Sequence, residues 1–264
     1  MDKILACVVC YVLFGVVYGN DLNLLMVERY GENPDAYMKT ERILKWLQPQ
    51  VSYQIPSMEK DEKQNVVMSA LCSSQKPPML KVEAQWNKEE SIQREDASIL
   101  GGFGTLIVDN EKDFCIPVAP SQKSFFAYYG AYLIPYDNVV QFESDSPLPL
   151  TEMRIGPLYA EQYLMDEQLG GGFYLETHDR PHFHMPLNVE ASGYLILGKM
   201  NGRYLEVSAF SIPYGYSVYT PPEVIHNDGF LVGHYKVVYS VTEHYSTVLL
   251  QNQTGQMLPV SIEK

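Results

Sequence analysis

The second half of this chain consists of short apolar runs separated by turn-forming residues. Of all features of the sequence, this pattern most narrowly restricts the fold. The runs 193–199, 203–210 and 234–242 are rich in Tyr, Val, Ile and Leu, and Gly, Pro or Asn lies at their ends. Such residues favour pleated strands, and such ends favour turns. Asn201-Gly202 separates two of the runs, as is typical of a β-hairpin. The pattern predicts a mainly β fold of the sandwich or barrel type.

The first part of the chain has a different pattern. Asn33-Pro34-Asp35 is typical of a helix start, and apolar residues in the segment 36–47 would lie on one side of a helix. We expect a second helix over 59–72. The sequence therefore predicts a small helical N-terminal region, residues 20–95, followed by a single β-barrel domain, residues 96–264.

The first nineteen residues have the composition of a secretory signal peptide. Lys3 precedes an apolar stretch from Ile4 to Val17, and the segment ends at Gly19. The stretch is too short for a stable membrane span. We expect a secreted chain; the alternative is a cytoplasmic protein with an apolar N-terminal element.

The charge of the chain limits its partners. The net charge of −13 disfavours nucleic acid and anionic membrane surfaces. Hydrophobic residues make up 46% of the chain, which is enough for a substantial core.

Histidines are concentrated in one segment. All six of them lie between His178 and His244. His182 and His184 are separated by one residue, so a strand would place both imidazoles on one face. Together with the more distant His226 they predict a metal site, since imidazole is a common ligand of zinc, copper, iron and nickel. The alternative is a set of hydrogen-bonded core or surface histidines.

The spacing of these residues resembles that of the cupin superfamily. The resemblance covers roughly residues 160 to 245. Gly215, Pro221 and His226 match the second cupin motif, whereas Glu223 and Phe230 stand where the family has glycine and asparagine. The first motif is matched by the His-x-His pair and by the later glycine that closes it. The resemblance implies a cupin-type jelly-roll barrel, and cupins commonly form homodimers.

The resemblance also implies a ligand set. His182, His184 and His226 would bind a divalent ion, and Glu190 would lie near the family's glutamate ligand. Such a set suits Mn, Fe, Ni or Zn.

Two further residues are candidates for acid–base roles. His178 lies four residues before His182, where it would act as a general base or as a substitute ligand. The alternative is an exposed histidine in a turn, with neither role. Glu206 shares a strand face with Tyr204 and Ser208, and it would be an acid or base if that face lines the interior. If the face meets solvent, Glu206 has no such role.

We expect a metal-dependent enzyme that acts on a small polar substrate such as a sugar. An isomerase is the leading interpretation, because a metal ion can stabilise an enediolate while a base moves a proton. An Fe-dependent dioxygenase is the nearest alternative. A secreted cupin that binds or stores carbohydrate without catalysis is the alternative from another class.

Overall fold

The computed structural model describes residues 25–62, 73–88, 104–109, 114–239, 242 and 244–263. The expected signal peptide, residues 1–19, lies outside this part of the chain. The segment predicted as a second helix is described only at its start, where residues 59–62 are not helical.

Strands dominate the described residues, so the mainly β prediction is confirmed. The strands are β1 (Glu28–Tyr30), β2 (Tyr37–Leu47), β3 (Ser52–Gln54), β4 (Leu80–Asn87), β5 (Gly104–Val108), β6 (Phe114–Pro117), β7 (Tyr132–Pro135), β8 (Val139–Gln141), β9 (Leu148–Ile155), β10 (Tyr174–His178), β11 (His182–Pro186), β12 (Ser192–Asn201), β13 (Tyr204–Phe210), β14 (Tyr216–Thr220), β15 (Ile225–Val238), β16 (Tyr245–Gln251) and β17 (Val260–Glu263). The short helices are α2 (Lys123–Tyr129) and η1 (Ala160–Leu164). Within the described ranges, no helix is long and apolar enough to cross a membrane.

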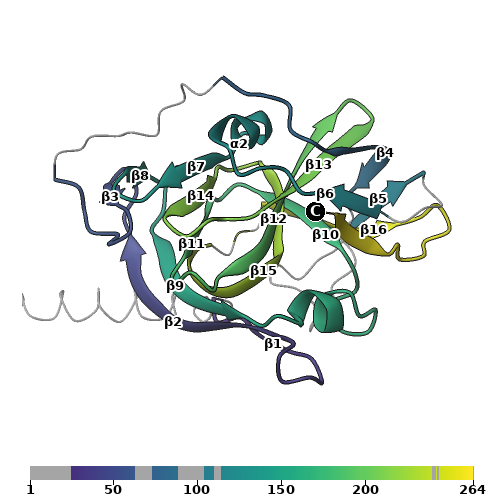
Figure 1. Ribbon diagram of the computed structural model, residues 1–264, viewed down its shortest axis with the longest axis horizontal. Helices are drawn as coiled ribbons and strands as arrows, with labels where there is room; N and C mark the ends of the chain where they lie inside the picture. Colours follow the sequence, from purple (N-terminus) through teal and green to yellow (C-terminus); the bar gives the residue numbers. More distant parts are fainter. Residues whose placement is uncertain are drawn as a thin grey trace, which may run out of the picture.

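The long strand β15 joins two layers of strands (Figure 1). Its first half pairs with β12 and β10, and its second half pairs with β9 and β11. Strand pairing connects thirteen strands into one mixed sheet, in which β16 and β5 run parallel. The sheet as a whole is not closed into the single barrel expected from the sequence, because β1 and β7 each pair with only one neighbour.

The hydrophobic core has a central part and two outer parts. The central part contains side chains from both layers, such as Met153 and Tyr235 from one and Leu197 from the other. The small sheet β3–β8 covers the outer face that carries Phe183, and the small sheet β6–β17 contributes to the other outer cluster. In Figure 1, β3 and β8 lie on one side of the molecule and β6 lies on the other. Alternate residues of a central strand therefore face different cores.

The helix predicted over 36–47 is wrong, because this segment forms the strand β2, which pairs with β9. Its pairing shifts register between Thr40 and Arg42 and again between Ile43 and Lys45. A bulge adds one residue to a strand and interrupts the alternation of buried side chains. Two bulges so close together give the apolar residues a spacing similar to that of a helix. The N-terminal region contributes β1, β2 and β4 to the large sheet.

Two glycines provide a test of this β architecture. A Cβ on Gly193, whose φ is +79°, would lie 2.2 Å from the carbonyl oxygen of Phe230. Gly202, in the turn between β12 and β13, has φ +62° but no heavy atom within 4 Å of such a Cβ. We expect Gly202→Ala to lower the free energy of unfolding by about 1 kcal/mol. Gly193→Ala should lower it by about 3 kcal/mol, as measured by urea unfolding. Equal effects would contradict the close packing of β12 on β15.

Candidate metal centre

Three strands each supply two alternate side chains to one buried site. These residues are Glu176 and His178 of β10, His182 and His184 of β11, and His226 and Asp228 of β15. All six are buried. The strands are held together by the pairing of Glu176 with His226 and by the pairing of β11 with the second half of β15. The site therefore depends on segments that are far apart in the sequence.

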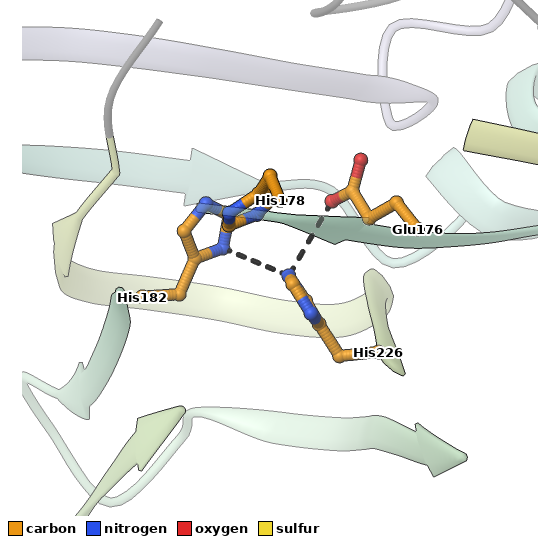
Figure 2. A group of neighbouring side chains, drawn as sticks. All are labelled: Glu176, His178, His182 and His226. Atoms are coloured by element: carbon orange, nitrogen blue, oxygen red, sulfur yellow. Dashed lines mark hydrogen bonds and ion pairs between the residues drawn. The ribbon is translucent and has the colours of Figure 1, made fainter. Parts of the chain in front are cut away.

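Four of these side chains converge on one point. Glu176, His178, His182 and His226 each offer one ligand atom, and these atoms all lie within 4.8 Å of one another. Figure 2 shows the imidazoles of His182 and His226 meeting beside the Glu176 carboxylate. His226 Nε2 is 3.1 Å from His182 Nδ1 and 3.5 Å from Glu176 Oε1. Ligands on one zinc-sized ion lie about 3.0–3.5 Å apart, given bonds of about 2.0–2.2 Å. The arrangement therefore suits one shared cation.

The orientation of the His226 ring is set by the backbone. Its Nδ1 lies 2.9 Å from the carbonyl oxygen of Val224. Because a carbonyl oxygen only accepts, Nδ1 carries the hydrogen and donates it. The lone pair of Nε2 is then directed towards His182 and Glu176. Metal-binding histidines are commonly fixed in this way by the ring nitrogen that does not bind the metal.

His178 contributes an imidazole whose nitrogens make no hydrogen bond to the described residues. Both of its ring nitrogens are buried, and neither has a hydrogen-bond partner among the described residues. Its ring centroid lies 4.4 Å from that of His182 and 5.0 Å from that of His226. A buried polar atom without a partner calls for an explanation. A bound cation would supply the missing partner for a nitrogen of His178.

The histidines are prepared to act as neutral ligands. Burial lowers the pKa of His182 well below its ordinary value, and the neighbouring histidines lower it further. Burial is also the main reason why the pKa of His226 falls to about 3. Metal ions bind the neutral imidazole, so these lowered pKa values remove competition from protons at neutral pH.

The carboxylate of the group has the opposite shift. Burial, together with the nearby charge of Asp228, raises the pKa of Glu176 to about 8. Two buried carboxylates so close together repel each other when both are ionised. A divalent cation would remove this repulsion and would favour the ionised form of Glu176.

The apoprotein should lose stability as the pH falls from about 6.5 towards 3. Burial lowers the pKa of His178, His182 and His226 below the 6.5 of an ordinary histidine, so the unfolded state takes up protons that the folded state does not. Each histidine then costs up to about 1.4 kcal/mol per pH unit. Glu176 acts in the opposite sense, because its pKa of about 8 lets the folded state hold an extra proton above 4.5. On acidification, the loss of stability from the three histidines exceeds the gain from this one carboxyl group.

Urea unfolding with a chelator present, at about pH 7 and about pH 5, measures this effect. The His182→Gln/His226→Gln variant should lose less stability on acidification than the wild type. Equal losses in the two proteins would contradict the assignment of the effect to these histidines.

His184 belongs to a second group with His182 and Asp228. Its Nε2 lies 3.1 Å from Asp228 Oδ2, and the Tyr174 hydroxyl donates to Asp228 Oδ1 over 2.9 Å. Burial alone would raise the pKa of Asp228, but the hydrogen bond with His184 and the nearby imidazoles lower it below its ordinary value. Asp228 is therefore an ionised carboxylate beside the first group.

The predicted site residues have different positions in the structure. His182, His226 and His178 lie in the four-residue group, and His184 lies in the group beside it. Glu190 is exposed in the turn between β11 and β12, and the structure does not bring it to either group. Sequence reasoning missed the carboxylates Glu176 and Asp228. Each lies two residues from a histidine, and this spacing was the one signal that indicated them.

Glu206 is buried at a different place. The Tyr128 hydroxyl donates to its Oε2 over 2.5 Å, and Lys76 and Lys81 lie 3.5 and 3.4 Å from its Oε1. The hydrogen bond from Tyr128 is the main cause of its lowered pKa, to which the two lysines contribute. Glu206 thus joins α2 to the start of β4 and is in neither histidine group.

The chain matches no protein-family model, no curated protein and no solved structure to which it was compared. The chemistry of the buried group is therefore the basis for a function.

Proposed function

We propose that this chain is a cupin-like metal-binding protein in which Glu176, His178, His182 and His226 hold one divalent ion. The observation that supports this most directly is the convergence of four buried ligand atoms within 4.8 Å. Three strands supply these atoms, and two of them, β10 and β11, each pair with the third, β15.

The ligand set restricts the identity of the ion. Three imidazoles and one carboxylate suit Mn, Fe, Ni or Zn. Calcium and magnesium prefer sites made wholly of oxygen ligands. Four protein ligands leave open positions on an ion that takes more than four, and a substrate needs such positions.

The reaction we propose is an isomerisation of a small polar substrate such as a sugar, in a secreted protein. A bound ion would act as a Lewis acid on adjacent substrate oxygens. The chain itself supplies the buried His184 imidazole beside the four-residue group, and Asp228, whose Oδ2 lies 3.1 Å from its Nε2, orients this ring for proton transfer. The surrounding strands exclude water from these groups.

Metal content tests the binding proposal. The chain beginning at Asn20 is incubated separately with Mn, Fe, Ni and Zn salts, dialysed and analysed by mass spectrometry. The wild type should retain at least one ion per chain, whereas the His182→Ala/His226→Ala variant should retain none in this group. His244→Ala is the matched control, because His244 is exposed and outside the buried groups. A metal-free wild type, or equal retention in the double variant, would refute the proposal.

Proton exchange tests the proposed reaction separately. An isomerase that forms an enediolate exchanges the hydrogen beside the carbonyl carbon with solvent. Aldoses and ketoses are incubated in heavy water with the metal-loaded protein and followed by proton NMR. Exchange that disappears in the double variant supports the isomerase. Stoichiometric metal without any exchange would leave a metal-binding protein and would refute this reaction.

A further inference from the structure

We propose that a second divalent ion binds beside the first one, held by His182, His184 and Asp228, so that the His182 ring serves both ions. This inference rests on the proposed function for the first ion. It makes the buried site a two-metal centre. The class of ligand is again a transition-metal dication, because two imidazoles and a carboxylate form the set.

The second group has the same kind of geometry as the first. One ligand atom from each of its three residues lies within 4.8 Å of the others. The His184 Nε2–Asp228 Oδ2 separation of 3.1 Å equals the His226 Nε2–His182 Nδ1 separation in the first group. Both values lie in the range of about 3.0–3.5 Å expected between ligands of one zinc-sized ion. A proton bridges such a pair when no ion is bound.

His184 has binding capacity that the described protein residues do not use. The Nε2 of His184 lies 3.1 Å from Asp228 Oδ2, so this nitrogen already has a partner. Nδ1 is buried, and it has no hydrogen-bond partner in the described part of the chain. His184 itself is only 1% exposed. The orphan Nδ1 is the ring nitrogen that does not face Asp228, so the second site is argued from Nε2 and its distance to Asp228.

Within the described ranges, the buried carboxyl group of Asp228 has no strongly basic side chain beside it. No lysine or arginine side chain among the described residues lies within ion-pair distance of it. Its partners there are the His184 ring and the Tyr174 hydroxyl. A buried carboxylate ordinarily pairs with a cation or coordinates a metal. A dication between Asp228 and the two histidines would provide this compensation.

His182 connects the two groups. Its Nδ1 faces His226 in the first group, which leaves the other ring nitrogen for the second ion. The His182 and His184 ring centroids lie 5.8 Å apart, and the two side chains are on the same face of β11. One imidazole can bind two ions when both of its nitrogens are deprotonated. The two ions would then be bridged through one ring.

Metal stoichiometry with copper(II) and zinc tests this inference. Equilibrium dialysis followed by mass spectrometry should give two ions per wild-type chain. His184→Ala and the nearly isosteric Asp228→Asn should each retain one ion, as should His178→Ala, which removes a ligand of the first group only. His244→Ala should retain two. Circular dichroism of each metal-free variant identifies any variant that does not fold. If His184→Ala does not fold, the ion count of Asp228→Asn tests the second site in its place.

Electron paramagnetic resonance of the copper-loaded proteins tests the shared ring. Two copper ions bridged by one imidazole are magnetically coupled, so the integrated wild-type signal should be smaller than the copper content. His184→Ala should give a signal equal to its copper content. An uncoupled signal from two copper ions would overturn the bridging role of His182.

The outcomes separate the two proposals. One ion per wild-type chain, unaffected by His184→Ala but lost in the His182→Ala/His226→Ala variant, overturns the second site and leaves the first. Two ions that are both retained in His184→Ala and in Asp228→Asn also overturn the second site. No bound ion in the wild type overturns both proposals.

Discussion

Saturating divalent metal should raise the free energy of unfolding of the wild-type chain by at least about 4 kcal/mol when its concentration is a thousandfold above the Kd. The same metal should stabilise His226→Ala less than the wild type, because this variant lacks one ligand of the first group. The folded state presents the four ligand atoms within 4.8 Å of one another, whereas the unfolded chain separates them. Binding to the folded state alone therefore shifts the unfolding equilibrium.

The weaker stabilisation of His226→Ala by metal follows from the position of His226 in the first group. His226 Nε2 contacts both His182 and Glu176, at 3.1 and 3.5 Å. Even residues that only orient metal ligands contribute about 10–100-fold to affinity, and His226 is proposed as a direct ligand.

Urea unfolding followed by circular dichroism, with zinc or with a chelator, measures this shift. His244→Ala should behave as the wild type does, since it also removes one imidazole but from an exposed position. Stabilisation of His226→Ala by zinc to the wild-type extent would show that the ion binds elsewhere.

Truncation of Phe183 should have the largest effect on the stability of the metal-free protein. Phe183→Ala should lower the free energy of unfolding by about 3–5 kcal/mol. The side chain is fully buried, and its ring packs edge-on against Phe142 at a centroid distance of 5.7 Å. Its removal would leave a cavity in the outer core under β3 and β8.

The same substitution should weaken metal binding. Phe183 lies between His182 and His184 in β11 and points to the opposite face of the strand. It therefore fixes β11 in the position at which the two imidazoles face the site. Zinc titration of Phe183→Leu, which keeps most of the volume and should cost less than about 1.5 kcal/mol, separates this effect from unfolding.

An exposed aromatic residue provides the control. Tyr30 is 57% exposed in β1, so Tyr30→Ala should change the free energy of unfolding by less than about 1 kcal/mol. Thermal and urea unfolding of the three variants give the comparison. A Phe183→Ala effect no larger than that of Tyr30→Ala would mean that β11 does not pack as described.

Local patterns predicted β12, β13 and the second half of β15. The runs over 193–199, 203–210 and 234–242 lie within or overlap β12, β13 and β15. Alternation along a strand is a property of nearest neighbours, so it can be read from the sequence without knowledge of the fold. For the same reason the common face of His182 and His184 followed from their spacing.

The same local reasoning failed in β2. Strand pairing with β9 decided the structure of this segment, and two bulges concealed the alternation. Helix preference in a short segment amounts to a few tenths of a kcal/mol per residue. Burial of Met38 and Thr40 between neighbouring strands outweighs such a preference.

The carboxylates of the site illustrate what depends on long-range pairing. Glu176 reaches the histidines because β10 pairs with β15 at Glu176 and His226, which are fifty residues apart in the sequence. Glu190 is closer in sequence to His184, but it lies in an exposed turn. The resemblance to the cupin motif therefore indicated a carboxylate that the fold places away from the histidines.

By itself, the sequence determined the β character of the chain, the shared face of the His-x-His pair and the presence of imidazoles suited to a transition metal. These properties depend on side-chain chemistry and on alternation along single strands. Only the tertiary structure decided which residues meet, because Glu176, His178, His182 and His226 lie on three strands whose order and register are set by packing between distant segments. Burial, which lowers the pKa of His182 and His226 and raises the pKa of Glu176 to about 8, likewise exists only in the folded chain.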